Sequence, residues 1–189
     1  MSLFYKIQKA VIGWFGNILI YPYPMFINFG HTSYKMKGED VRDVLNIIQP
    51  GDILLRRYNH YISGLMIPGY YTHSAIYMGN NKIIHMLGDG IDKQDILTFC
   101  RCDSVAIIHC NQEQISKGAI KKARDLYIKD VEYDFGFNFS DKTRHSCTEA
   151  VSFFYDDPKM DRKKENYIMP DDFLTLDKSL FEITYQKGK

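Results

Sequence analysis

The segment "RHSCTEAVSFFY" places Cys147 two residues after His145, at the expected start of an apolar helix. A cysteine nucleophile reacts as a thiolate, and both a helix N-terminus and a nearby imidazole lower the pKa of a thiol. The first backbone N–H groups of a helix have no partner within the helix, so they can stabilise an oxyanion. These residue types predict acyl transfer through a thioester, provided that the fold supplies a base.

The base has to come from one of the histidines of the chain. A catalytic base usually comes from another element than its nucleophile, so we give His145 a capping or lining role and keep Ser146 as the other candidate cap. A thiol, a base and a residue that orients the base form a catalytic triad. We predict Cys147 as nucleophile with His73 and His85, from two neighbouring strands, although a lone strand histidine is more often a core residue. The candidate histidines are His31, His60, His73, His85, His109 and His145.

The turn between the segments "YTHSAIYMG" and "KIIHML" decides whether their two histidines can meet. Successive side chains of a strand point to opposite faces of the sheet. A two-residue turn at Asn80–Asn81 would therefore put His73 and His85 on opposite faces. We predict a β-bulge, or a loop with an odd number of residues, between Tyr77 and Ile84.

The remaining pattern predicts helices and antiparallel strands that are segregated along the chain, which is typical of the α+β class. The segment 88–99 is expected to be a connection with one short element. Helices are expected over residues 3–19, 39–49, 113–130, 147–155 and 170–176. Strands are expected over residues 52–57, 71–79, 82–87, 104–110, 133–139 and 180–186.

An ordered set of motifs spans most of the chain: "QPGDILL", "THSAIYMG", "IIHM", "YDFGFNF", "SCTEAVSFFY" and "IMPDDF". Together they resemble the circularly permuted branch of the NlpC-type papain-like fold over roughly residues 47–187. This branch includes the bacterial YiiX and YaeF proteins, a poxvirus protein group and the relatives of lecithin–retinol acyltransferase. In these proteins the histidine strand precedes the cysteine helix, as it does here.

The resemblance implies a papain-like fold, with an antiparallel sheet or small barrel packed against helices. It also implies that Cys147 is the nucleophile, that His73 is the base and that His85 is the third polar residue. His85 is the least secure of the three, because YiiX-like members often have a carboxylate at that position. Tyr71 and Tyr133 are candidates for lining the substrate cleft.

The function expected from these residues is that of a cysteine-dependent hydrolase or acyltransferase. Its substrate would be an amide or ester, either acyl-lipid or peptide-like, and no cofactor is expected. A non-catalytic lipid- or peptide-binding module on the same scaffold is the alternative. A zinc site built from Cys147, His73, His85 and His145 is a further alternative, although their spacing matches no recognised zinc pattern.

The composition sets limits on the partners. The 189 residues contain 24 Lys and Arg against 23 Asp and Glu, so the net charge of +1 gives no basic footprint for nucleic acid. We expect Cys100, Cys102 and Cys110 to be reduced and structural. The oligomeric state stays open.

The N-terminal residues predict an amphipathic helix whose apolar face either docks on the domain or lies in a membrane interface. Residues 10–30 contain no charged side chain, but Pro22 and Pro24 interrupt them, so a spanning helix is not expected. We divide the chain into residues 1–46, with this helix and a connecting segment, and a catalytic domain over residues 47–189. A cytoplasmic or peripherally membrane-associated protein is favoured over a secreted one. The apolar face consists of Phe4, Ile7, Val11, Trp14, Phe15 and Ile18.

Overall fold

A computed structural model of the chain describes residues 3–16, 19–22, 25–28, 34–136, 143–155 and 168–188. The helices are α1 (Leu3–Gly16), α2 (Gly38–Ile47), α3 (Ser63–Met66), α4 (Ile96–Phe99), α5 (Glu113–Ile128), α6 (Cys147–Tyr155) and the 3-10 helix η1 (Pro170–Thr175). The strands are β1 (Leu19–Pro22), β2 (Met25–Asn28), β3 (Ile53–Arg57), β4 (His73–Gly79), β5 (Lys82–Leu87), β6 (Gly90–Asp95), β7 (Ser104–Cys110), β8 (Glu132–Tyr133), β9 (Arg144–His145) and β10 (Phe181–Gln186).

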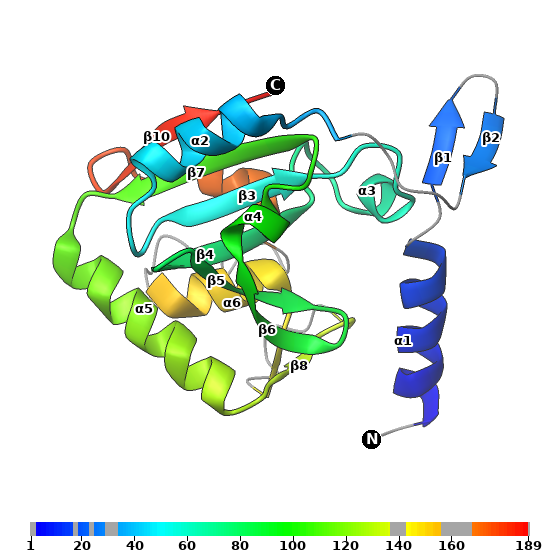
Figure 1. The fold of residues 1–189 in the computed structure, drawn as a ribbon. Coiled ribbons are helices and arrows are strands. Elements are labelled where there is room, and N and C mark those ends of the chain that lie inside the picture. The colour runs from blue at the N-terminus through cyan, green and yellow to red at the C-terminus, as the bar shows by residue number, and fades with distance from the viewer. Residues whose placement is uncertain are drawn as a thin grey trace.

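The centre of the molecule is a six-stranded sheet with the strand order β10-β7-β3-β4-β5-β6, shown in Figure 1. Every neighbouring pair in this sheet is antiparallel. The strands β1 and β2 form a separate antiparallel pair, and β8 and β9 a short parallel one. The predicted α+β class is therefore confirmed.

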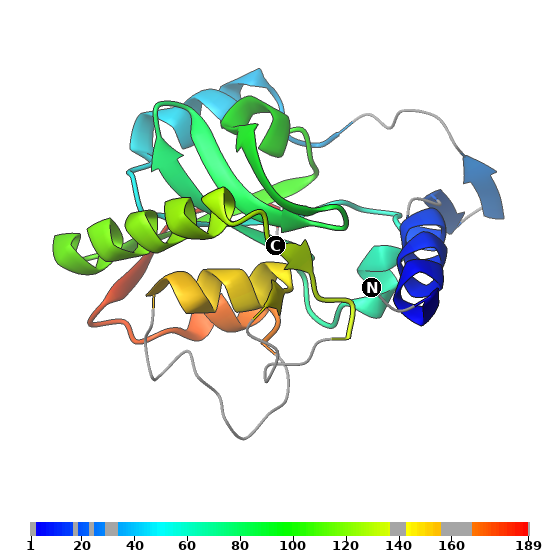
Figure 2. The same ribbon diagram turned by 90° about the horizontal axis from the view of Figure 1, so that it is seen from below.

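The two faces of the sheet pack against different helices. Ile53 and Ile76 are cross-strand partners, so they point to the same face, which packs against α5, α6 and η1. Leu54 and Ala75 are the next partners and point to the other face, which packs against α2 and α4. Figure 2 shows α5 and α6 side by side across the sheet. Apolar side chains on both faces of the central strands thus build two cores, one on each face.

The hairpin of β4 and β5 contains the predicted irregularity. Its register pairs Ala75 with His85 and Tyr77 with Ile83, and it shifts between Tyr77 and Gly79. The turn residues Asn80 and Asn81 have positive φ angles of 51° and 59°, which asparagine tolerates better than most residues. Because His73 and Ala75 lie two residues apart in one strand, His73 and His85 share a face, and the prediction of a bulge is confirmed.

Three predicted segments differ from their prediction, and the strands β1, β2 and β9 were not predicted. The segment expected as a connection contains the strand β6, whose polar sequence "GIDKQD" lacks an apolar alternation because β6 is the edge strand of the sheet. The strand expected over residues 133–139 is the two-residue β8, and residues 137–139 lie outside the described part. The N-terminal helix was expected to reach residue 19 but ends at Gly16.

The helix α1 turns its apolar side chains away from the domain. Ile7, Val11, Trp14 and Phe15 are between 48% and 65% exposed. The contacts with the domain come from the polar side: Gln8 Nε2 donates to the carbonyl of Phe135 at 3.1 Å, and Lys9 Nζ lies 3.2 Å from an oxygen of Asp89. The helix therefore docks on the domain through polar side chains, while these four apolar side chains stay exposed. Figure 2 shows α1 beside α3 at one end of the molecule.

The segment before residue 47 does not stand apart from the sheet. Met36 and Val44 are buried in the core on the α2 face, although the domain boundary was placed after residue 46.

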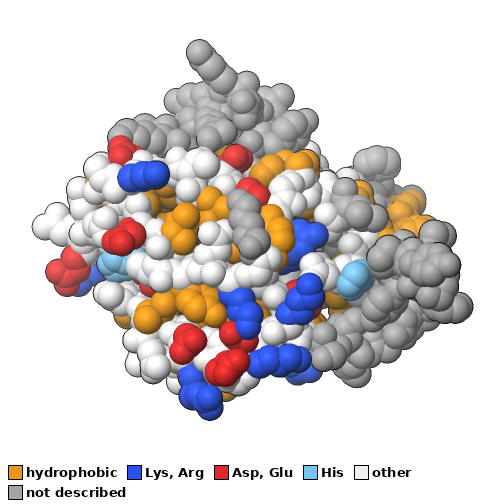
Figure 3. All heavy atoms as spheres, turned by 90° about the horizontal axis from the view of Figure 1, so that it is seen from above, with side chains coloured by type: hydrophobic (Ala, Val, Ile, Leu, Met, Phe, Trp, Pro, Cys, Tyr) orange, Lys and Arg blue, Asp and Glu red, His pale blue; other side chains and the backbone are white. Residues whose placement is uncertain are grey.

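Figure 3 shows acidic and basic side chains interspersed on one face of the molecule. Within the described ranges, no helix has the length and apolar character needed to cross a bilayer.

We expect Gly51→Ala to lower the free energy of unfolding by roughly 2 to 4 kcal/mol, because Gly51 has a positive φ of 94° and a Cβ there would lie 2.6 Å from the Cβ of Ser116. Gly118→Ala in α5 is the control, since a Cβ at that position meets nothing within 4 Å. A helix interior favours alanine over glycine by about 0.5 to 1 kcal/mol, so the control is expected to gain stability. Urea unfolding measures both; equal stability of the two variants would contradict the expected strain.

Candidate active site

The helix α6 begins with a capping box that fixes Cys147 at its first turn. The backbone N–H of Ser146 donates to Glu149 Oε2 at 2.5 Å, and the N–H of Glu149 donates back to Ser146 Oγ at 3.3 Å. Ser146 rather than His145 is therefore the cap. The signal for it was present in the sequence, because "SCTE" has the spacing of a capping box.

The thiol of Cys147 is buried, with 6% of the residue exposed. Burial raises its pKa above the ordinary value, although the backbone and hydroxyl of Ser74, the N–H of Thr148 and the charge of Arg56 act in the opposite direction. The helix N-terminus thus contributes as expected but does not outweigh desolvation. Cys147 is a protonated thiol at neutral pH and needs a base in order to react.

Tyr133 lies against this thiol. Burial, followed by the neighbouring Cys147 and Glu149, raises the pKa of Tyr133 well above its ordinary value, while the backbone N–H of Cys147 lowers it. The ring packs on Phe135 with 4.8 Å between centroids. Tyr133 therefore presents a protonated hydroxyl at the thiol of Cys147.

Tyr71, the other tyrosine predicted to line the cleft, belongs to the core instead. It has no exposed surface and packs in the core on the α6 face. Its backbone N–H donates to Asp171 Oδ1 at 2.7 Å. The aromatic content of the segment before His73 gave no means of separating a core ring from a cleft ring.

The two predicted histidines are in direct contact, with His73 Nε2 and His85 Nδ1 2.9 Å apart. Burial, and then the charge of Arg56, lowers the pKa of His73 well below its ordinary value and that of His85 to about 3. Both rings are therefore neutral at pH 7, and one of the two facing nitrogens donates to the other.

The surroundings of His85 favour one tautomer of the pair. His85 Nε2 is buried without a hydrogen-bond partner and lies 3.9 Å from Asp92 Oδ2. A proton on this nitrogen faces a carboxylate, whereas a lone pair there would be repelled by it. His85 Nδ1 then accepts from the Nε2–H of His73, which leaves Nδ1 of His73 free to take a proton.

The thiol and the imidazole pair lie on opposite sides of the first residues of β4. Ser74 is fully buried on the face of α6, where it contacts Cys147, whereas His73 points to the face of α4. Among the described residues no hydrogen bond joins the thiol to either ring. His73 is half-buried and forms the last register pair of β4 with β3, so its ring lies at the sheet's end. His73 is therefore the direct chain neighbour of Ser74, the residue that contacts the thiol of Cys147.

The other described histidines lie on other elements of the fold. His145 is buried, and its ring stacks on Phe153 at a centroid distance of 5.4 Å. His109 Nδ1 lies 2.7 Å from the buried Asp52 Oδ1, and its strand β7 is three positions from β5, which carries His85. His31 is outside the described residues, and His60 lies in the segment between β3 and α3. In the parts of the chain that the structure describes, no group of three histidine, cysteine or acidic side chains is arranged to hold a metal ion.

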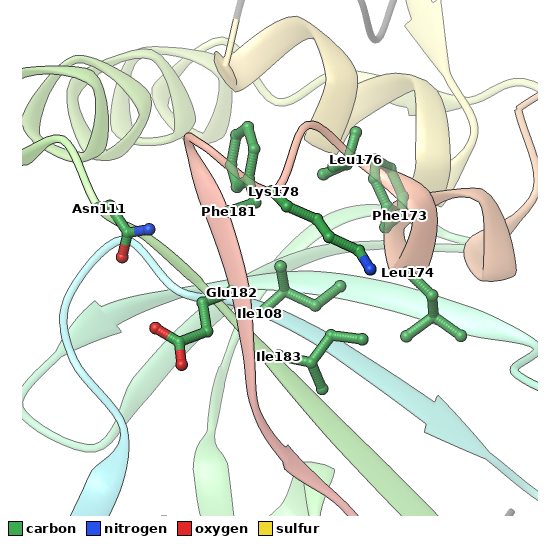
Figure 4. A pocket seen from close by; sticks show the side chains of 9 residues that line it. All are labelled: Ile108, Asn111, Phe173, Leu174, Leu176, Lys178, Phe181, Glu182 and Ile183. Atoms are coloured by element: carbon green, nitrogen blue, oxygen red, sulfur yellow. The ribbon is translucent and has the colours of Figure 1, made fainter.

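A separate apolar pocket lies at the opposite edge of the sheet, between β10 and η1, with a volume of about 310 Å³ (Figure 4). The strands β7 and β3 lie between β10 and β4, and none of the predicted catalytic residues lines the pocket. Its lining residues are Ile108, Asn111, Phe173, Leu174, Leu176, Lys178, Phe181, Glu182 and Ile183.

Comparison with protein families gives one match. A family model described as permuted papain-like amidase enzyme, YaeF/YiiX, C92 family, matches residues 47–184. This range contains all three predicted catalytic residues and most of the chain. Comparisons with curated proteins and with solved structures found no match.

We expect iodoacetamide to alkylate Cys147 slowly at neutral pH and progressively faster as the pH rises, because burial raises the pKa of this thiol above its ordinary value. Only the thiolate reacts, so the rate should increase about tenfold per pH unit below that pKa. Mass spectrometry of the Cys147 peptide from about pH 5 to pH 10 measures the rate of alkylation. Cys100 and Cys102, each with a pKa raised to about 12, are internal controls. A rate that is already constant around pH 7 would show a preformed thiolate–imidazolium pair instead.

Proposed function

We propose a role for each residue of this site on the premise that the chain belongs to the permuted papain-like amidase family, YaeF/YiiX, C92. Membership makes the chain an enzyme of the cysteine amidase and peptidase class. Cys147 is the nucleophile, His73 the general base and His85 the residue that orients His73. One observation carries this assignment. The neutral rings of His73 and His85 are joined at 2.9 Å, and His73 is the chain neighbour of Ser74, which contacts the thiol of Cys147 at the start of α6.

The reaction begins with proton transfer from the thiol to His73. The sulfur of Cys147 then attacks the carbonyl carbon of the substrate. The oxyanion that forms accepts hydrogen bonds from the backbone N–H of Cys147 and from the hydroxyl of Tyr133. The C–N or C–O bond of the substrate breaks, and the leaving amine or alcohol takes its proton from His73.

The resulting thioester is resolved by a second acyl transfer. Water, or an acceptor alcohol or amine, loses its proton to His73 and attacks the thioester carbonyl, and the Cys147 thiol is released. Water gives hydrolysis, and an acceptor molecule gives an acyltransferase. Hydrolysis of an amide follows most directly from the family, and ester or acyl-transfer chemistry uses the same residues.

A non-catalytic binding module, the alternative named from the sequence, disagrees with the family membership, although two observations agree with it. The pKa of Cys147 is raised by burial, and no hydrogen bond joins its thiol to His73 among the described residues. A scaffold that only binds an acyl lipid or peptide-like molecule would show the same features. Formation of an acyl-enzyme on Cys147 separates the two candidates, because a binding module forms none.

We expect Cys147→Ala to abolish turnover of amide and ester probes, and His73→Asn to lower kcat/KM by about 10²- to 10⁴-fold, as loss of a general base does. His85→Asn should give a smaller loss, since His85 acts through His73. A panel of fluorogenic acyl amides and esters measures turnover, and intact-protein mass spectrometry detects the thioester. Cys110→Ala, which removes another buried thiol, should keep full activity. Turnover that survives Cys147→Ala would overturn the assignment.

We also propose that the enzyme works at a membrane surface on acyl lipids, which we favour over peptide-like substrates. The support is the unpartnered apolar face of α1, where Trp14 is 65% and Ile7 55% exposed. The charged residues among the first 38 are all lysines, so this segment complements anionic lipid headgroups. An amphipathic helix with apolar and basic sides lies in the plane of the membrane interface.

We expect the protein to co-sediment with phosphatidylglycerol vesicles, and the double variant Val11→Ser with Trp14→Ser to bind at least about tenfold more weakly, because it loses buried apolar area. Ile128→Ser is the control, since Ile128 is 73% exposed at the end of α5. It should bind as the wild type does. Absence of binding to these vesicles, or a lipid-free dimer in light scattering that the double variant breaks, would contradict the membrane proposal.

A further inference from the structure

Arg56 in β3 is a buried cation without an anion. The residue is only 7% exposed, and its guanidinium lies over two rings, 4.9 Å from the centroid of Tyr58 and 4.6 Å from that of Phe99. Among the described residues no carboxylate forms an ion pair with it, and its Nε is closed to solvent without a hydrogen-bond partner. Arginine is seldom buried to this extent unless it is paired.

The neighbouring Arg57 shows what a structural arginine looks like in this fold. Its Nε donates to Asn59 Oδ1 at 2.8 Å, and one of its Nη atoms donates to the carbonyl of Tyr70. The guanidinium of Arg57 is thus held by groups of the chain itself. Arg56 contacts aromatic rings, and no described residue accepts a hydrogen bond from its Nε.

Arg56 lies directly beside the proposed base. It is the cross-strand partner of His73, so both side chains point to the same face of the sheet. Phe99 contacts all three charged or polar groups of this cluster, with 6.2 Å from its centroid to the ring of His73 and 6.2 Å to that of His85. The unpaired cation therefore belongs to the catalytic end of the sheet.

The groups around this cation do not neutralise it. The two histidines carry no negative charge, and burial raises the pKa of Cys100 and of Cys102 to about 12, so both thiols are uncharged. The carboxylate of Asp103, which lies close to Cys102, accepts hydrogen bonds from two backbone N–H groups instead. The charge of Arg56 is left available for a ligand.

We propose that Arg56 binds an anionic group of the substrate, a carboxylate or a phosphate, beside the acyl group that Cys147 attacks. The inference rests on the proposed function, because it makes Arg56 a specificity residue of the same site. A guanidinium offers two parallel N–H donors, a geometry that matches both anions. A bound anion also removes the net positive charge next to His73 and so assists this imidazole when it takes the proton of the thiol.

Two kinds of molecule present this chemistry with a cleavable acyl group. An N-acyl amino acid carries a carboxylate two bonds from its amide nitrogen, and an acyl glycerol phosphate carries a phosphate near its ester. Both consist of an anion and an acyl chain. They differ in the anion and in the bond that breaks, so matched substrates distinguish them.

The first test compares two alkylating reagents that differ in charge and uses no substrate. Iodoacetate and iodoacetamide transfer similar groups to a thiolate, but iodoacetate carries a carboxylate. We expect the ratio of their rates at Cys147 to exceed the ratio measured for free cysteine at the same pH and ionic strength. Arg56→Gln should lower that ratio at least tenfold. Arg101→Gln, which removes an exposed cation, should leave it unchanged.

Two further measurements keep the test decisive if Arg56→Gln does not fold. Arg56→Lys retains the positive charge but lacks the two parallel N–H donors of the guanidinium, so it should keep part of the preference for iodoacetate. In the wild-type protein, inorganic phosphate or acetate should slow the alkylation by iodoacetate more than chloride does at equal ionic strength. A ratio equal to that of free cysteine, with no protection by either anion, would overturn the proposal.

The source of the anion is identified with substrate pairs. N-acylglycine is compared with its neutral glycinamide analogue, and acyl glycerol phosphate with acyl glycerol. We expect Arg56→Gln to raise KM about tenfold or more for the anionic member of the preferred pair and to leave the neutral member unchanged. Equal loss on both members would make Arg56 a structural residue. The outcome is separate from the nucleophile assignment, which Cys147→Ala tests.

Discussion

The bulge between Tyr77 and Gly79 determines on which side of the sheet His85 lies, and the rest of the site depends on it. Side chains alternate along a strand, so a shift of one residue would turn His85 to the face of α6. The ring would then lie among the apolar residues that pack on that helix, and His73 would lose its partner at 2.9 Å. The positive φ angles of Asn80 and Asn81 belong to the tight turn that follows the bulge.

The same alternation separates the thiol of Cys147 from the imidazole pair that we propose as its base. Ser74 points to the thiol, and His73 points to His85 and Arg56 on the other face. Desolvation acts on both sides, because it raises the pKa of Cys147 and lowers the pKa of both histidines. The resting site therefore holds neutral reacting groups next to one fixed cation. Charge develops only during proton transfer, where preorganised N–H and O–H donors contribute most.

The sequence predicted the parts of this fold that a periodic pattern encodes. The strand over residues 104–110 and the hairpin that carries His73 and His85 follow from apolar alternation and turn residues, and the bulge follows from requiring the two rings to meet. The strand β6 was missed because an edge strand is defined by its pairing with β5 and needs few apolar side chains. Tyr71 was misplaced because burial of a ring depends on tertiary packing.

Arg56 was missed for a related reason. Two arginines follow the apolar residues of β3, and in the sequence they indicate only the polar end of a strand. The structure shows that Arg57 donates to acceptors, whereas Arg56 lies over aromatic rings. The raised pKa of Cys147 was also beyond the sequence. A helix start can be recognised from "SCTE", but the burial that opposes it by raising the pKa of Cys147 depends on tertiary packing.

The position of α1 connects the exposed apolar face to the chemistry. Its two polar contacts reach Phe135, two residues after Tyr133, and Asp89, three residues before Asp92. The first segment carries the Tyr133 side chain at the thiol of Cys147, and the second carries the Asp92 carboxylate near His85. A bilayer that received the apolar face of α1 would therefore lie near the end of the sheet where β4 begins and β5 ends. An acyl chain leaving that bilayer would have a short path to Cys147, and its anionic headgroup would approach the same end of β3 that holds Arg56.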